Sequence, residues 1–360
     1  MIHLMRFGFL FVVFSACFNF THTVRAQVPP CVPSSNVTVI ATGLNNPRGL
    51  KFGPDGQLYV AEGGLGGSLT TVGCRQVDPP IGPYSGDFNA RVVRVGPQGA
   101  LTPVAENLPS SQTQPLPVPL VSGVGDVAFI GNTLYGLLAG AGCSHGLAGT
   151  ENGVIRINPG GTTLIADLST FIQTNPVANE EHDDFEPDGT FYSMVAVRGD
   201  LYAVEPNHGE LDKITPDGEI TRVVDFSATF GHVVPTAIAY NGNFYVGTLG
   251  TFDNNFNGMI IKVTPSGQTQ VVLSGLSSIL GIAIREGKIY VLENQGGFPT
   301  LCSGRVLRVS HSGNLDKIDV IATGLQHPTA MTLGPDGNLY VSNFGYGFPQ
   351  GAGQVVRINL

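Results

Sequence analysis

The stretch GPDGQLYVAE at residues 53–62 returns as GPDGNLYVSN at residues 334–343. In both copies a turn rich in Gly and Pro leads into an apolar run that begins with Leu-Tyr. Six of the ten tyrosines share this setting, in which a Leu, Phe or Ile precedes the tyrosine just after a turn signal. These six are Tyr59, Tyr135, Tyr202, Tyr245, Tyr290 and Tyr340. A setting that recurs at intervals of tens of residues indicates a repeated structural unit.

Each repeat has the pattern of four short strands. An apolar run such as RGLKF (48–52) or PTAIAY (235–240) precedes the tyrosine strand. A loop follows, and then a hairpin with a Gly- or Pro-rich turn, such as RVVRVGPQGALTPVAE (91–106). The sixth unit ends at GQVVRINL (353–360), after its third strand. We denote the four strands of a unit A to D.

The missing fourth strand is found at the front of the chain. VIATGLNNP (39–47) matches VIATGLQHP (320–328), which leads out of strand D of the fifth unit, at seven of nine positions. Residues 36–44 are therefore a D strand without a unit of their own. We predict an all-β, six-bladed β-propeller with four antiparallel strands per blade, closed by the N-terminal strand completing the last blade. A β-helix has shorter coils, and a sandwich would not repeat one four-strand unit six times.

The first residues have the features of an export signal. Arg6 precedes an apolar run from Phe7 to Phe18, and Val24-Arg25-Ala26 offers a cleavage site. A membrane anchor would need about 20 apolar residues, and Cys17 lies in a poor context for lipid attachment. We therefore expect a signal peptide at residues 1–26, a single propeller domain at residues 27–360, and a secreted or periplasmic protein.

Charge excludes some classes of partner. Removal of residues 1–26 leaves 16 basic and 27 acidic residues, because the 18 basic residues of the chain lose Arg6 and Arg25, so the net charge is −11. Such a chain repels phosphate backbones and anionic membranes. We expect no nucleic acid partner, no membrane span and a monomer.

The longer segments are predicted to share one face of the ring. In an up-and-down blade the A–B and C–D turns share one face, and here they are tight. The B–C loops and D–A links share the other face and include the long segments 63–89, 140–152, 249–257, 294–304, 344–352, 107–122 and 168–190. Because long loops on a rigid scaffold commonly carry binding sites, we expect a small organic ligand, a glycan or a protein to bind there, at the mouth of the central channel.

Two columns of residues are predicted to surround that mouth. The entry to strand A gives Arg48, Gly125, Tyr192, Thr236, Leu280 and Thr329, and the exit of strand B gives Glu62, Leu138, Glu205, Thr248, Glu293 and Asn343. The candidate ligand-binding residues from and beside these columns are Arg48, Glu62, Asp126, Tyr192, Glu205, His208, Glu293, Asn294 and Asn343.

The acidic members of this set allow two interpretations. Glu62, Glu205 and Glu293 are candidate ligands of a single divalent cation such as calcium. Alternatively, these acids are solvated or cap backbone amides at the strand ends. The run EEHDDFEPDG (180–189) lacks the ligand spacing of an EF-hand loop, so we expect a solvated linker there.

Four cysteines follow the expected signal peptide, and an exported protein can pair them. Cys74 and Cys143 lie in B–C loops of adjacent blades on the same face, so we expect a disulfide between them. Elimination then pairs Cys31 with Cys302. The chain has no CxxC motif.

Three segments resemble a known family. GLNNPRGLKFGPDGQLYVAEGG (43–64), DGTFYSMVAVRGDLYAVEPNHGELDKITPDG (188–218) and GLQHPTAMTLGPDGNLYVSNFGYG (324–347) are similar to the ScyD/ScyE family of exported propellers. The likeness covers nearly the whole mature chain. It implies the propeller fold and export, and it brings no set of catalytic residues.

A broader resemblance is to the NHL-type and SMP-30/gluconolactonase six-bladed propellers. Gluconolactonases place a metal-binding Glu at the strand A entry, where this chain has Arg48, whose guanidinium cannot bind a cation. Two functions therefore stay open, because a fold by itself does not identify an activity. The first is an exported binding propeller, and the second is a metal-assisted hydrolase, lactonase or lyase with an acidic ring at the channel mouth and Arg48 holding an anionic substrate.

Overall fold

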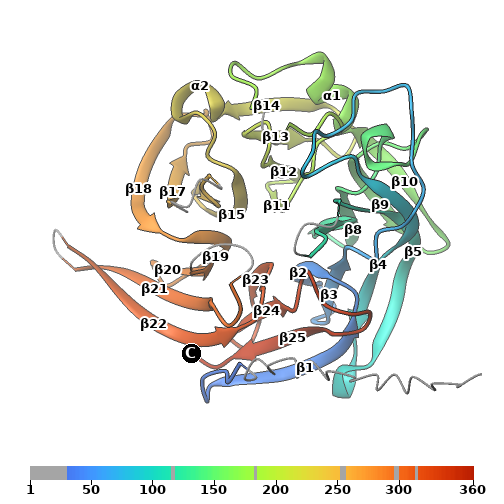
Figure 1. Cartoon of the computed structure of the whole chain (residues 1–360). Helices are drawn as coiled ribbons and strands as arrows, with labels where there is room; N and C mark the ends of the chain where they lie inside the picture. The colour runs from blue at the N-terminus through green and yellow to red at the C-terminus, as the bar shows by residue number, and fades with distance from the viewer. Residues whose placement is uncertain (1–30, 115–117, 182–184, 252–256, 296–299, 313–314) are drawn as a thin grey trace, which may run out of the picture. The chain divides into compact units, whose positions relative to one another are not determined.

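Six antiparallel sheets follow one another between Cys31 and Leu360 and form a ring (Figure 1). The computed structural model describes residues 31–114, 118–181, 185–251, 257–295, 300–312 and 315–360. The expected signal peptide at residues 1–26 lies outside these ranges. The prediction of an all-β, six-bladed propeller is confirmed.

The blades are built from strands in chain order. Blade 1 contains β2 (Pro47–Phe52), β3 (Leu58–Glu62), β4 (Ser85–Val95), β5 (Leu101–Gln112) and the short β6 (Val121–Ser122). Blade 2 contains β7 (Val124–Ile130), β8 (Thr133–Leu138), β9 (Gly153–Asn158) and β10 (Gly161–Asp167). Blade 3 contains β11 (Ser193–Val197), β12 (Asp200–Glu205), β13 (Glu210–Ile214) and β14 (Ile220–Asp225).

The second half of the ring repeats this order. Blade 4 contains β15 (Pro235–Asn241), β16 (Asn243–Thr248), β17 (Gly258–Val263) and β18 (Thr269–Leu276). Blade 5 contains β19 (Ser278–Arg285), β20 (Lys288–Asn294), β21 (Gly304–Ser312) and β22 (Leu315–Leu325). Blade 6 contains β23 (Ala330–Leu333), β24 (Leu339–Asn343), β25 (Gly353–Ile358) and β1 (Val37–Leu44). The described residues also form short helices between strands: η1 (Pro97–Gly99), η2 (Cys143–His145), α1 (Leu168–Thr174) and α2 (Ser227–Phe230).

Strand β1 closes the ring, as the sequence predicts. It pairs antiparallel with β25, with Val37 opposite Ile358 and Leu44 opposite Gly353. The side-chain amide of Asn36 donates to the carbonyls of Ile321 (3.1 Å) and Asn359 (3.0 Å) and so joins both neighbouring strands at this seam. The first and last strands of the propeller therefore belong to one sheet.

The tyrosine column has the same register in every blade. Each of the six tyrosines on strand B lies opposite a basic residue on strand C. The pairs are Tyr59 with Arg94, Tyr135 with Arg156, Tyr202 with Lys213, Tyr245 with Lys262, Tyr290 with Arg308 and Tyr340 with Arg357. Neighbouring residues on each strand point to opposite faces of the sheet. Those next to the tyrosines pack against adjacent blades, as Val60 does beside Val355 of blade 6.

The long segments differ in detail from the prediction. The expected loop 63–89 ends earlier, because β4 begins at Ser85, and the expected link 107–122 is shortened by the extension of β5 to Gln112 and by β6. Helix α1 occupies the start of the link 168–190. Among the described helices, none is long and apolar enough to cross a membrane.

Two disulfides bond the cysteines in the pairs named from the sequence, Cys74–Cys143 and Cys31–Cys302. The first joins loops of blades 1 and 2, and the second joins the segment before β1 to the loop after β20. Both pairs are compatible with a protein that folds in an extracellular or periplasmic space.

Candidate functional site

The polar side chains at the exits of strand B bind the backbone of their own blades. In four blades a carboxylate or amide oxygen accepts a hydrogen bond from a main-chain N–H in the link that precedes strand A. The pairs are Glu62 with Asn45 (2.7 Å), Glu205 with Thr190 (2.8 Å), Glu293 with Ser277 (3.0 Å) and Asn343 with Gln326 (2.7 Å). All four side chains are buried. This column therefore fixes the links between blades.

Two of these glutamates also have a basic partner on strand C. The second oxygen of Glu62 accepts from Arg91 Nε at 2.8 Å, and that of Glu293 accepts from Arg305 Nε at 2.6 Å. Burial raises the pKa of Glu62, against the opposing effects of the Asn45 N–H and the Arg91 guanidinium.

The three metal candidates from the sequence lie on three different blades. Glu62, Glu205 and Glu293 are each held by separate local partners, and the second oxygen of Glu205 accepts from the main-chain N–H of His208. Within the described ranges, no group of three or more His, Cys, Asp or Glu side chains could hold a metal ion. The arrangement supports the second of the two interpretations of these acids, in which they cap backbone amides.

Asp126, near the start of β7, contacts the inner strands of blades 1, 2 and 3. Its carboxylate accepts from the main-chain N–H groups of Val127 (2.8 Å) and Met194 (2.9 Å), and from the hydroxyl of Ser193 (3.2 Å). Lys51 of blade 1 lies 3.6 Å away. Burial raises the pKa of Asp126, and Lys51 opposes that rise. We assign this residue a structural role beside the channel.

Arg48 of blade 1 and Tyr192 of blade 3, which are both predicted to line the channel mouth, lie next to each other. The guanidinium carbon of Arg48 lies 5.9 Å from the centre of the Tyr192 ring, and its Nη2 donates to the carbonyl of Val121. Both side chains are only partly buried. Within the part of the chain that the structure describes, no carboxylate forms an ion pair with Arg48. Several guanidinium N–H donors are therefore left for another group.

The Tyr192 hydroxyl reaches across to blade 6, where it donates to the carbonyl of Thr329 at 3.1 Å. Tyr346, from the loop after β24, accepts from the side-chain amide of Asn294 at 3.2 Å. Burial raises the pKa of both phenols, and Arg48 acts in the opposite direction on each. Arg48, Tyr192, Asn294 and Tyr346 thus form one group, which we call the mouth cluster.

Three of these four residues are candidates from the sequence analysis, and Tyr346 is a residue that it did not single out. Tyr346 lies in a loop, outside the strand columns, so its position relative to Arg48 could not be obtained from the repeat. The aromatic phrase NFGYG (343–347), with its two glycines, was the available signal.

His208 and the acidic run belong to a second, buried group beneath the loops of blades 1 to 3. His208 Nε2 lies 2.9 Å from the carbonyl oxygen of Glu186, and its ring packs 4.8 Å from that of Phe185. Glu186 accepts from the Tyr84 hydroxyl, and Asp188 is also buried. The expectation of a solvated linker is therefore wrong for residues 186–188, while residues 182–184 lie outside the described ranges.

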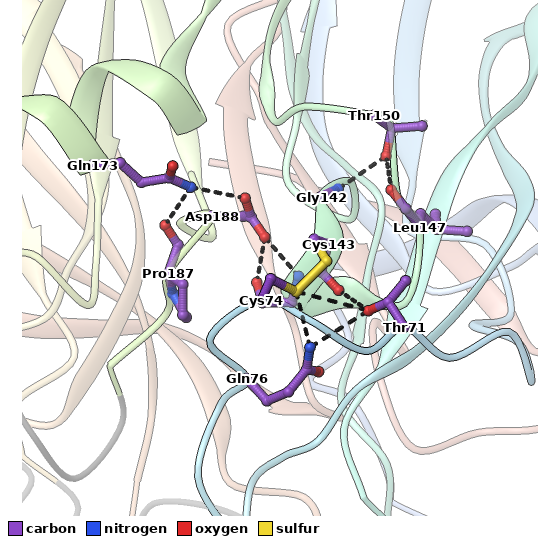
Figure 2. The surroundings of a disulfide bond; sticks show 11 residues. Thr71, Cys74, Gln76, Gly142, Cys143, Leu147, Thr150, Gln173, Pro187 and Asp188 are labelled. Atoms are coloured by element: carbon purple, nitrogen blue, oxygen red, sulfur yellow. Dashed lines mark hydrogen bonds between the residues drawn. A yellow bond between two sulfur atoms is a disulfide. The ribbon is translucent and has the colours of Figure 1, made fainter.

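Asp188 supports the loop that carries the Cys74–Cys143 disulfide (Figure 2). One carboxylate oxygen accepts from both the N–H (2.7 Å) and the hydroxyl (2.6 Å) of Ser144, next to Cys143. The other accepts from Gln173 at 3.0 Å. Loops of three blades are thereby held together on the same face as the mouth cluster.

His145 lies fully buried in this second group. Its Nδ1 is 2.7 Å from the Ser111 hydroxyl, and its Nε2 is 3.2 Å from the carbonyl of Gly189 and 3.5 Å from Glu186. Burial lowers the pKa of His145 to about 4, although Asp188 and the Gly189 carbonyl favour the charged form. The imidazole is therefore neutral in the folded protein at neutral pH.

We expect His145 to make the protein sensitive to acid. A histidine whose pKa is lower in the folded state stabilises fully above its unfolded pKa of about 6.5, and that contribution is lost as the pH falls from there toward 4. Urea unfolding of wild type and His145→Gln should show a stability difference that shrinks by about 3 kcal/mol between pH 7.5 and pH 4. A difference that stays constant over this range would contradict the assignment.

Two surface grooves lie away from the mouth cluster. One, of about 450 Å³, lies between blades 4 and 5 and is lined by Tyr245, Lys262 and Ile289 among others. The other, of about 750 Å³, lies between blades 6 and 1 beside Val39, Phe52 and Tyr340. Neither includes a candidate residue from the sequence analysis.

Comparison with known proteins identifies the fold. No family model and no curated protein matches the chain. Similar solved structures include a putative oxidoreductase (glucose dehydrogenase) from Thermus thermophilus, with 17% identity, a TM-score of 0.56, and coverage of 89% of this chain and 98% of that chain. The fold is also similar to that of a putative gluconolactonase, with 13% identity, a TM-score of 0.50, and coverage of 90% of this chain and 92% of that chain. An auxiliary nutrient-binding protein from Bacteroides thetaiotaomicron is similar with 10% identity, a TM-score of 0.52, and coverage of 90% of this chain and 76% of that chain. At these identities the likeness shows the six-bladed fold, which serves enzymes and binding proteins alike.

Proposed function

We propose that this chain is an exported propeller of the ScyD/ScyE type that binds a small organic anion at the mouth of its central channel. The observation that carries the proposal is the partly exposed guanidinium of Arg48, which has no carboxylate partner among the described residues. Arginine forms strong, directional hydrogen bonds with carboxylates. The anionic group of the ligand would occupy the donors that Arg48 leaves free.

The surroundings of Arg48 support binding over metal-assisted hydrolysis. Tyr192 places an aromatic ring beside the guanidinium. Tyr346, on whose phenol Arg48 acts electrostatically, is hydrogen-bonded to the amide of Asn294, which adds a polar group. The carboxylates that a metal would need are engaged with backbone N–H groups. Export is supported by the two disulfides and by the apolar segment at residues 7–18.

The test compares acids with their neutral amides. Calorimetry of the exported protein would use benzoate against benzamide and hexanoate against hexanamide. We expect the carboxylates to bind and the amides not to. Arg48→Gln should weaken carboxylate binding by about 10-fold to 100-fold, the value of hydrogen bonds to a charged group.

The matched control is Arg198→Gln, because Arg198 is an exposed arginine on the tight-turn face. This variant should bind as wild type does. Equal binding of acid and amide, or carboxylate binding that survives Arg48→Gln, would overturn the proposal. One tightly held divalent ion, lost in Glu205→Gln and Glu293→Gln, would favour the metal-assisted hydrolase.

A further inference from the structure

The loop after β24 carries three aromatic side chains, which gather with His327 of the link before β23. Tyr346 stacks on His327, with ring centres 4.4 Å apart and an angle of 10° between the planes. Phe348 lies 5.3 Å from His327 and 4.7 Å from Phe344, the latter in an edge-to-face arrangement. We call His327, Phe344, Tyr346 and Phe348 the aromatic shelf.

The shelf is partly exposed, and its exposed members are apolar. His327 and Tyr346 are buried, whereas Phe344 and Phe348 keep part of their surface in contact with solvent. Phe344 has a φ of 56°, in the left-handed region that residues with a side chain rarely adopt.

Arg48 and the loop that carries the shelf both lie close to residues 118–121 of the link from blade 1 to blade 2. Arg48 donates to the carbonyl of Val121, and a Cβ at Gly347 of the shelf loop would lie 3.1 Å from Val118. Tyr346 also belongs to both groups, because Arg48 acts electrostatically on its phenol. A ligand held by Arg48 therefore has an aromatic surface within its reach.

We propose that the ligand is an aromatic carboxylate whose ring packs on the shelf while its carboxylate binds Arg48. This inference rests on the proposed function and adds the chemical class of the apolar part. Aromatic rings pack edge-to-face and offset, and such pairs are worth more than the area they bury. An aliphatic group of equal size would gain only the free energy of burying its apolar surface.

The test holds charge and size constant and changes the aromaticity. Calorimetry with phenylacetate, cyclohexylacetate and acetate measures the contribution of the ring. Wild type should bind phenylacetate about threefold to tenfold more tightly than cyclohexylacetate, which is the range that aromatic pairs provide. Phe348→Leu, which keeps an apolar side chain, should bring this ratio close to one and leave acetate binding unchanged.

The control is Phe88→Leu, because Phe88 is 43% exposed and lies on β4, outside the shelf. It should keep the wild-type ratio. Equal affinity of wild type for phenylacetate and cyclohexylacetate would overturn the aromatic assignment and leave the Arg48 site standing. The ratio of phenylacetate to cyclohexylacetate affinity is measured on wild type, so the test can be made even if the Phe348→Leu protein fails to fold. Absence of Arg48-dependent binding for all three acids would overturn the proposed function itself.

Discussion

Substitution of Gly49 by alanine is expected to lower the free energy of unfolding by about 3–5 kcal/mol, because the new methyl group would displace Asp126. A Cβ at Gly49 would lie 1.8 Å from Asp126 Oδ1 and 2.6 Å from its Cα, so both side chain and backbone must move. The carboxylate would lose its hydrogen bonds to Val127 and Met194. Chemical denaturation of wild type and variant measures the loss.

Gly161→Ala is the matched control. Gly161 begins β10, and nothing lies within 4 Å of the position that its Cβ would take, so its substitution should change stability by less than about 0.5 kcal/mol. Because Gly49→Ala and Asp126→Ala disturb the same carboxylate, the double variant should be far less destabilised than the sum of the two singles. Additive effects would show that the contact at Asp126 is not the cause.

Replacement of Asp212 by valine is expected to stabilise the protein, whereas Gly49→Ala is expected to destabilise it. The residue is fully buried at a position of strand C where the other five blades have aliphatic residues. These are Val93, Ile155, Ile261, Leu307 and Val356. Within the described ranges, no N–H or hydroxyl group donates to either carboxylate oxygen of Asp212, and its carboxyl lies within hydrogen-bonding reach of the carboxyl of Glu210.

The electrostatic surroundings of Asp212 make its ionised form still less favourable in the folded protein. Burial raises the pKa of Asp212 well above its usual value, and the neighbouring carboxyl of Glu210 raises it further. Arg222 opposes the rise, but its Nε is bonded to Glu210. An acid whose pKa is higher in the folded state favours folding most below its unfolded pKa, and that advantage is lost as the pH rises through the folded pKa.

Asp212→Val should therefore raise the free energy of unfolding by about 1–4 kcal/mol at pH 8, a typical gain when an apolar residue replaces a buried charged group. The gain should shrink as the pH falls toward 4, and Asp212→Asn should show the same trend. Asp319→Asn is the control, because Asp319 is paired with Arg308 and Lys317, which lower its pKa, so its removal should be less favourable at high pH. A gain from Asp212→Val that does not vary between pH 4 and pH 8 would contradict this account.

The fold could be predicted because the repeat is written in the sequence. The column of tyrosines has one register in all blades, and the match between 39–47 and 320–328 identified the strand that closes the ring. The same columns contain Arg48 and Tyr192, whose side chains meet in the structure. What places them side by side is the curvature of the ring, which brings blades 1 and 3 together and has no signature in the repeat.

The residues at the exits of strand B show what the sequence repeat cannot predict. The repeat identified Glu62, Glu205 and Glu293 as equivalent, but not the direction in which their side chains point. Each turns to a main-chain N–H in the preceding link, whose position depends on loop geometry. Asp212, in contrast, could have been found, because ELDKI (210–214) departs from the apolar pattern of RVVRV (91–95) and its equivalents.

The pairing of β1 with β25 also determines the order in which the protein can mature. During synthesis β1 emerges first, and its partner appears roughly 320 residues later, since Val37 lies opposite Ile358. Until then β1 presents unpaired backbone groups and the exposed side chain of Val39, features that promote association between chains. Completion of the sixth blade must therefore wait until the C-terminal strand has been synthesised, and until then the unpaired edge of β1 is open to pairing with other chains.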